Sequence, residues 1–172
     1  MRYYLDFDRT LFDTDSFYEY LANRPGLERT RGLPAVELVE ALNQMAMDST
    51  LTFAPGELSQ FLFQDAASFL REKENAVTII TYGNATFQEI KVKSALTSIP
   101  RMSVMYTNEV RKGIYLAPHT HLHAGAVLAD DAVVELEILA EKCPSLTLYE
   151  MRRDGGEGDG RWPVIRSLAE LP

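Results

Sequence analysis

The sequence predicts an α/β protein built around a parallel sheet. Short apolar runs alternate with segments whose apolar residues recur at helical spacing, which is the pattern of successive strand and helix units. The length of 172 residues suits one compact domain with a small insertion. About five strands are expected, at residues 3–5, 76–80, 102–106, 126–129 and 146–151.

Helices are expected between the later strands. Apolar residues at helical spacing mark one helix face over residues 87–95 and another over residues 132–139. The segment 152–160 contains four glycines and mixed charge, so it is expected to be a loop. A short final helix is predicted from Pro163.

The interval 15–75, between the first two strands, lacks the alternation and has a helical pattern throughout. One helix is predicted from Pro34, since proline is common in the first turn of helices. A second helix is predicted after Pro55, with Gln64 and Asp65 as a point where it can divide. The interval should therefore be an insertion after the first strand.

Composition and charge argue against several classes of partner. The chain has 17 basic and 25 acidic residues and a net charge of -8, so on average it repels nucleic-acid phosphates and anionic lipids. No apolar run approaches the ~18 residues of a membrane span. The single cysteine, Cys143, cannot form an internal disulfide. We expect a cytoplasmic protein that binds neither nucleic acid nor membrane, and we leave its oligomeric state open.

Two aspartates, Asp6 and Asp8, follow the first predicted strand. Residues two apart in an extended chain lie on the same side, at the carboxyl edge of the sheet where α/β proteins bind ligands. Taken alone, such a pair also suits a solvated loop with a helix cap. The other strand ends favour the ligand-binding interpretation.

Polar groups also follow the second and fourth strands. Thr81, Tyr82 and Gly83 form a predicted turn that opens a helix, where a hydroxyl and backbone N–H groups can bind phosphate or cap the helix. Asp130 and Asp131 are two acids where a helix cap requires one. A divalent cation such as Mg²⁺ is well served by paired carboxylates.

In this order, the segments resemble the motifs of the haloacid dehalogenase superfamily. Its phosphatases follow Asp-x-Asp-x-Thr with Thr or Ser, then Lys, then paired acids, each after an apolar strand. This chain has Asp6-Phe7-Asp8-Arg9-Thr10, Thr81 and Asp130-Asp131 in those places, and the resemblance spans nearly its whole length. It implies a Rossmann-like core domain over residues 1–15 and 63–172 and a small helical cap over residues 16–62.

The resemblance also implies roles for these residues. Asp6 would be the nucleophile that forms an aspartyl-phosphate, and Asp8 would protonate the leaving group and then activate water. Mg²⁺ would be held by the Asp6 carboxylate, the Asp8 carbonyl and Asp130. Asp131 would coordinate it through water or orient the site, and Thr10 would stabilise the loop.

The phosphate would be bound by Thr81, Tyr82 and a lysine. Lys112 lies between the third strand and the acid pair, where the family usually places this lysine. Lys91 is the alternative, because it belongs to a Phe-Gln-x-x-Lys segment like that of related phosphatases. We favour Lys112, since a helix bearing Lys91 and Lys93 is expected to have a solvated face.

The implied activity is Mg²⁺-dependent hydrolysis of a phosphate monoester, with a small phosphorylated molecule as substrate. Asp8 argues against a dehalogenase, which needs no acid at that position. A phosphotransferase or mutase would use the same residues. A low-turnover binding or regulatory module that retains the fold is the alternative from a different class.

Two further clusters are open to more than one interpretation. Alternating histidines can bind a transition metal, although a simple connection into the fourth strand is the favoured interpretation of His119, His121 and His123. Aromatic residues after the first motif can line a substrate pocket or pack in the core, namely Phe12, Phe17, Tyr18 and Tyr20.

Overall fold

The computed structural model, which describes residues 1–99 and 102–172, has the parallel α/β architecture that the sequence predicts. Six strands lie in the order β3-β2-β1-β4-β5-β6, and all neighbours are parallel. The five predicted strands are confirmed to within one residue at each end. They are β1 (Tyr3–Leu5), β2 (Val77–Thr81), β3 (Ser103–Tyr106), β4 (Val127–Asp130) and β5 (Thr147–Met151).

A sixth strand, β6 (Val164–Ile165), stands where the sequence predicted a final helix from Pro163, so that prediction is wrong. The carbonyls of Pro163 and Ile165 accept backbone hydrogen bonds from Glu150 and Arg152, which a helix would not allow. Within the described tail, the only helical turn is the short 3-10 turn η4 (Leu168–Glu170). Two residues are too few to show the period of a strand.

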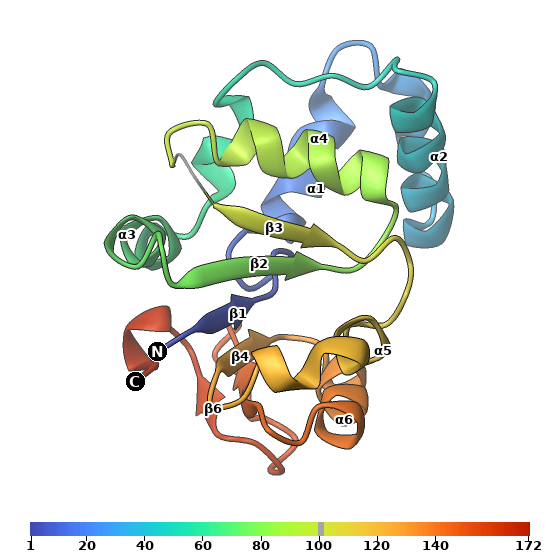
Figure 1. The fold of residues 1–172 in the computed structure, drawn as a ribbon. Helices are drawn as coiled ribbons and strands as arrows, with labels where there is room; N and C mark the ends of the chain where they lie inside the picture. The colour runs from blue at the N-terminus through green and yellow to red at the C-terminus, as the bar shows by residue number, and fades with distance from the viewer. Residues whose placement is uncertain (100–101) are drawn as a thin grey trace.

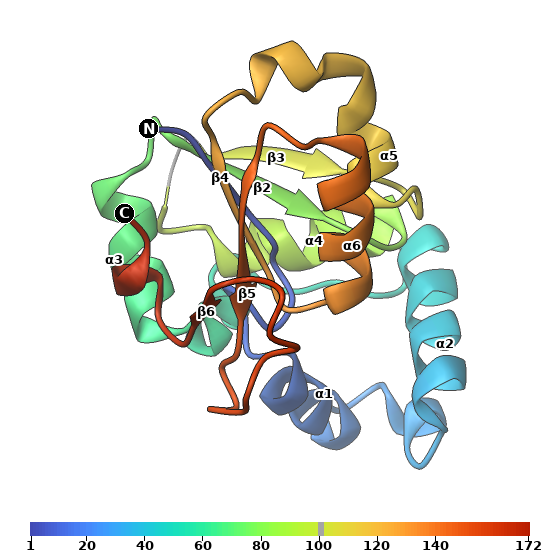
Figure 2. The ribbon, with the colours of Figure 1, turned by 90° about the horizontal axis from the view of Figure 1, so that it is seen from below.

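Helices cover both faces of the sheet (Figures 1 and 2). α3 (Gln64–Glu72) and α4 (Ala85–Ala95) pack on one face, and α5 (Lys112–Leu116) and α6 (Val133–Lys142) pack on the other. Alternate residues of β1 point to opposite faces, so Leu5 joins the first apolar cluster and Tyr4 joins the second.

The inserted interval is helical, as predicted, but it is broken into shorter pieces. It contains α1 (Thr14–Asn23), the 3-10 turn η1 (Glu28–Thr30), α2 (Ala35–Met47) and the 3-10 turn η2 (Glu57–Phe61). The helix predicted after Pro55 is divided into η2 and α3, close to the predicted point at Gln64.

The chain is extended at this division because its backbone pairs with the loop after β1. The amide of Asp13 donates to the Phe61 carbonyl at 2.7 Å, and the amide of Phe63 donates to the Leu11 carbonyl at 3.0 Å. These bonds hold the loop that carries Asp8 against the end of the inserted segment.

The inserted segment shares its apolar core with one face of the sheet. Leu21 and Leu42 belong to the same cluster as Leu5 and Phe7, and all four are fully buried. Figure 1 shows α2 on the side toward which β2 and β3 point. The division into a core domain of residues 1–15 and 63–172 and a cap of residues 16–62 stays a prediction.

The chain termini lie side by side, and the Tyr3 hydroxyl donates a hydrogen bond to the Pro172 carbonyl (Figure 1). In the described part of the chain, no helix combines the length and the apolar character needed to cross a membrane.

Candidate functional site

The candidate site lies at the carboxyl ends of β1 and β4. The strand order reverses between these two neighbours, which is where open α/β sheets bind ligands. Asp6 follows β1, Asp130 ends β4, and the amide of Asp6 donates to the Ala129 carbonyl at 3.0 Å. The parallel pairing therefore brings together acids that are far apart in the sequence.

Asp6, Asp130 and Asp131 form an acid cluster in which one oxygen from each carboxylate lies within 4.8 Å of the others. Asp6 and Asp130 are buried, and Asp6 Oδ2 has no hydrogen-bond partner among the described residues. A buried carboxylate oxygen without a partner is costly unless a ligand satisfies it. Since every donor is an oxygen, the residues fit a hard divalent cation such as Mg²⁺.

Lys112 links two of these acids. Its Nζ donates to Asp6 Oδ1 at 2.5 Å and to Asp130 Oδ2 at 2.6 Å, and the side chain is 2% exposed. Burial alone would lower the pKa of Lys112, but the charges of Asp130 and Asp6 outweigh burial and raise that pKa. The ammonium group is therefore charged and fixed beside Asp6, the position that the sequence favoured for it.

The positions of α5 and α6 explain how Lys112 reaches the acids. Glu135 of α6 accepts hydrogen bonds from the Lys112 amide and from the Arg111 guanidinium, at 2.9 and 2.8 Å. A Cβ on Gly113 would lie only 2.7 Å from the Ile138 carbonyl oxygen, so only glycine allows α5 to approach α6 this closely. Neither contact is visible in the sequence, because both depend on how two helices pack.

Asp8 is held by a second lysine. Lys91 Nζ lies 2.5 Å from Asp8 Oδ1 and 2.8 Å from Oδ2, and Lys91 is 1% exposed. Thr14 Oγ1 donates to Oδ1 at 2.7 Å, and Gln88 Nε2 donates to Oδ2 at 3.0 Å.

The prediction that Lys91 lies on a solvated helix face is therefore wrong. Lys91 stands one turn after the buried Phe87 on α4, so both residues face the interior. The Phe-Gln-x-x-Lys segment was the one sequence signal that pointed to Gln88 and Lys91 together. No motif or spacing in the sequence pointed to Thr14, Arg111 or Glu135.

The two aspartates after β1 differ in proton affinity. Burial raises the pKa of Asp6 well above its ordinary value, with Lys112 offsetting part of the rise and Asp130 adding to it. Burial also acts to raise the pKa of Asp8, but the charge and hydrogen bond of Lys91 outweigh it, and the pKa lies below the ordinary value. Burial, followed by the charge of Asp130, raises the pKa of Asp131 to about 6.

An ionised Asp6 and a protonated Asp8 would require the opposite, namely a lower pKa for Asp6 than for Asp8. A divalent cation at the acid cluster would lower the pKa of Asp6. A phosphate dianion beside Asp8 would raise the pKa of Asp8, because like charges favour protonation. Both changes go in the direction that the implied roles need.

The predicted phosphate-binding turn follows β2. Thr81 is buried, and its Oγ1 has no hydrogen-bond partner among the described residues. Gly83 has a φ of +123°, which favours glycine, and Asn84 caps α4 by accepting from the Phe87 amide. Tyr82 lies under the Arg111 guanidinium, 4.7 Å from the ring centroid. The binding of phosphate by Thr81 and Tyr82 stays a prediction.

A cavity of about 380 Å³ opens over these residues. It is lined by the candidate site residues Asp6, Asp8, Lys112, Asp130 and Asp131. The inserted segment and the β2 turn also line it, through Tyr18, Ala35, Val39 and Tyr82.

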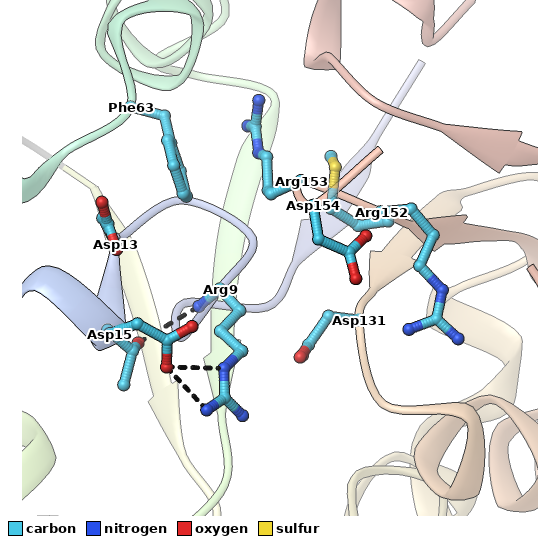
Figure 3. Close-up of a pocket in the computed structure, with 10 residues that line it drawn as sticks. Arg9, Asp13, Asp15, Phe63, Asp131, Arg152, Arg153 and Asp154 are labelled. Atoms are coloured by element: carbon cyan, nitrogen blue, oxygen red, sulfur yellow. Dashed lines mark hydrogen bonds and ion pairs between the residues drawn. The ribbon is translucent and has the colours of Figure 1, made fainter. Parts of the chain in front are cut away.

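A second cavity of about 350 Å³ adjoins the first and shares Arg9, Thr14 and Asp131 with it. Figure 3 shows Arg9, paired with Asp15, on one side of this cavity and Asp131 and Arg152 on the other. The two cavities therefore lie next to each other at the carboxyl edge.

Thr10 is buried in the loop after β1, and its carbonyl accepts hydrogen bonds from Arg153 at 2.8 and 3.1 Å. This position suits the structural role expected for Thr10.

The aromatic residues after the first motif divide between core and site. Phe12 and Phe17 are fully buried in the core, whereas Tyr18 lines the first cavity. The Tyr20 hydroxyl donates to Glu57 at 2.6 Å.

The described histidines lie outside the acid cluster. His119 is exposed, and the buried His123 is hydrogen-bonded through Nδ1 to the Tyr4 hydroxyl at 2.6 Å. The side chain of His121 lies outside the described residues.

Neither a family model nor a curated protein matches this chain. One of the solved structures that match is YfnB of Bacillus subtilis, which is named as a HAD-hydrolase and has magnesium bound. Its TM-score is 0.63, and its sequence is 16% identical over 99% of this chain and 96% of YfnB. A dehalogenase with an intermediate complex has a TM-score of 0.63 and 16% identity, over 99% of this chain and 94% of the dehalogenase. A Thermotoga maritima protein named as a β-phosphoglucomutase has a TM-score of 0.58 and 17% identity, over 96% of this chain and 94% of that protein. The chain therefore has the haloacid dehalogenase-like fold.

Proposed function

We propose that the protein is a Mg²⁺-dependent phosphatase that hydrolyses a phosphate monoester through an aspartyl-phosphate. The observation that carries this proposal is that the two aspartates after β1 line one cavity and are paired with different lysines. A nucleophile and a general acid or base must act separately on the same substrate. The two environments allow that separation.

In the proposed reaction, a carboxylate oxygen of Asp6 attacks phosphorus and the bond to the leaving oxygen breaks. Asp8 gives its proton to that oxygen, and later takes a proton from the water that attacks the aspartyl-phosphate. Lys112 stabilises the charge that develops beside Asp6, while Thr81 and the Tyr82 amide bind the phosphate.

In the proposed metal site, the cation would be held by the Asp6 carboxylate, the Asp8 carbonyl and the Asp130 carboxylate. Asp131 would coordinate it through water or orient the site. The cation would supply positive charge that offsets the repulsion between an anionic nucleophile and an anionic phosphate. The unpartnered Asp6 Oδ2 supports this assignment.

The cavities favour a small phosphorylated molecule as substrate. Volumes of about 380 and 350 Å³ lie within the roughly 300–1,000 Å³ typical of small-molecule sites. The inserted segment contributes Ala35 and Val39 to the wall, so we expect residues 16–62 to control specificity.

Asp8 also serves a phosphotransferase or mutase, in which a second hydroxyl accepts the phosphoryl group in place of water. The fold that this chain shares with a protein named as a phosphoglucomutase keeps that alternative open. Dehalogenation is less well supported, because it requires no acid at Asp8.

The test is release of inorganic phosphate from a panel of phosphorylated metabolites by the purified protein with Mg²⁺. We expect turnover of at least one small ester, loss of turnover after chelation, and loss in a folded Asp6→Asn variant. Turnover that survives exhaustive metal removal, or that persists in Asp6→Asn, would contradict the mechanism.

A further inference from the structure

Lys91 contacts Asp8 without lining the proposed substrate cavity. Asp8 is one of the residues that line the cavity, whereas Lys91 is not among them and is 1% exposed. Lys91 Nζ lies 2.5 and 2.8 Å from the two Asp8 oxygens. A side chain in this place cannot touch a substrate, so any effect on the reaction must pass through Asp8.

The ammonium group is enclosed by aromatic rings. Lys91 Nζ lies between 5.2 and 5.9 Å from the centroids of four phenylalanine rings. Ring faces at this distance attract a cation, and the rigid apolar walls leave the lysine stem little freedom. These rings belong to Phe7, Phe12, Phe17 and Phe87.

Two neutral donors complete the support of Asp8. Thr14 Oγ1 donates to Oδ1 at 2.7 Å, and Gln88 Nε2 donates to Oδ2 at 3.0 Å. Gln88 Nε2 also reaches the Tyr82 carbonyl at 3.2 Å, so it is oriented by the predicted phosphate-binding turn. The Asp8 carboxylate therefore has one rotational position relative to that turn.

We propose that Lys91 is a positioning residue that, with Gln88, aims the Asp8 carboxyl at the leaving-group oxygen. This role rests on the proposed phosphatase activity. As the Asp6 oxygen bonds to phosphorus and the phosphorus–oxygen bond breaks, the electron pair stays on the leaving oxygen, which takes the proton of Asp8. Proton transfer requires hydrogen-bond contact, and a small displacement of the donor costs much of its effect.

The test compares esters that differ in their need for a proton. An alkyl phosphate releases an alkoxide unless it is protonated, whereas p-nitrophenyl phosphate releases a stable phenolate. We expect Lys91→Met to lower kcat/KM about 10²-fold for the alkyl ester and to keep it within about threefold for the p-nitrophenyl ester. The values are compared at the maximum of each pH–rate profile, so that a change in the protonated fraction of Asp8 does not enter.

Two further variants make the test specific. Gln88→Leu keeps Lys91 and is expected to lower kcat/KM about tenfold for the alkyl ester, with little change for the p-nitrophenyl ester. This variant keeps the proposal testable if Lys91→Met does not fold. Lys93→Met is the matched control, because Lys93 lies on the same helix with 71% of its side chain exposed. In an Asp8→Asn background, Lys91→Met should have no further effect on the alkyl ester.

The role of Lys91 would be overturned if Lys91→Met lowered kcat/KM equally for both esters, or if it lowered kcat/KM for the alkyl ester by the same factor in the Asp8→Asn background. Either result would leave the proposed phosphatase activity intact. Hydrolysis of neither ester by the wild-type protein would overturn the proposed function and this role with it.

Discussion

At the scale of single residues, the site balances four carboxylates against two ammonium groups. Asp6, Asp8, Asp130 and Asp131 carry four negative charges when ionised, and Lys112 and Lys91 return two. The remaining two negative charges match one divalent cation. The nearby Arg9 and Arg111 do not alter this balance, because each is paired with a carboxylate of its own, Asp15 and Glu135.

Replacing Lys112 tests its assigned role beside Asp6, the proposed nucleophile. Lys112→Met should lower kcat by about 10² to 10³, because a fixed donor beside the developing charge acts mainly in the transition state. Phosphate release at saturating substrate measures the loss. Lys142→Met, with an exposed lysine, is the control; near wild-type turnover by a folded Lys112→Met protein would refute the assignment.

The sequence indicated Lys112 through its order among the motifs but misplaced Lys91. Phe87 and Lys91 are four apart and share a helix face, so the period was consistent with burial. The expectation that lysines are exposed outweighed it. Only the tertiary partner, Asp8, makes a buried ammonium group acceptable there, and no local pattern identifies that partner.

At the scale of elements, the short helix α5 depends on α6 for its position. Its five residues are too few to form a stable helix alone. The absent side chain of Gly113 and the carboxylate of Glu135 fix it against α6. The sequence did not predict this helix, because one turn and a half shows no clear period.

Gly113→Ala should displace α5 and with it Lys112. The added Cβ would meet the Ile138 backbone, and we expect a cost of about 1–3 kcal/mol in the free energy of unfolding together with loss of turnover. Gly26→Ala is the comparison, since Gly26 has a φ of +88° and open space around it. It should lose stability and keep its activity. A fully active Gly113→Ala protein would show that α5 tolerates displacement.

At the scale of the protein as a whole, Asp65 of α3 connects the C-terminal segment to the loop after β1. It accepts hydrogen bonds from Arg153, Ser167 and the Leu168 amide, at 2.8 to 2.9 Å. Arg153 in turn donates to the Thr10 carbonyl. Burial acts to raise the pKa of Asp65, but these donors outweigh it and the pKa lies below 3.8.

Asp65→Asn should therefore destabilise the protein in a pH-dependent way. A lowered pKa contributes stability above the ordinary value of 3.8 and loses it as pH falls through the folded-state pKa. We expect a loss of about 1–2 kcal/mol at neutral pH, after allowance for partial exposure, that shrinks below roughly pH 4. Denaturant unfolding at several pH values measures it, with the exposed Glu40→Gln as control. A loss independent of pH would contradict the ionic origin of the contact.

The parallel sheet could be predicted from the sequence because buried parallel strands are continuous apolar runs, and their carboxyl ends must share an edge. The shared site of Asp6 and Asp130 was predicted from this rule together with the resemblance to the haloacid dehalogenase motifs. The edge strand β6 was missed because its two residues are specified by pairing with β5 and not by local pattern.

Trapping the phosphoryl group tests directly whether Asp6 is the nucleophile. An Asp8→Asn variant should form the aspartyl-phosphate from p-nitrophenyl phosphate with Mg²⁺ and hydrolyse it slowly, because no base activates the water. After acid quenching, peptide mass spectrometry should find one phosphoryl group on Asp6, removable by hydroxylamine and absent from an Asp6→Asn, Asp8→Asn double variant. A phosphoryl group on another residue, or phosphate release with Asp6 unlabelled at every time point, would contradict the claim.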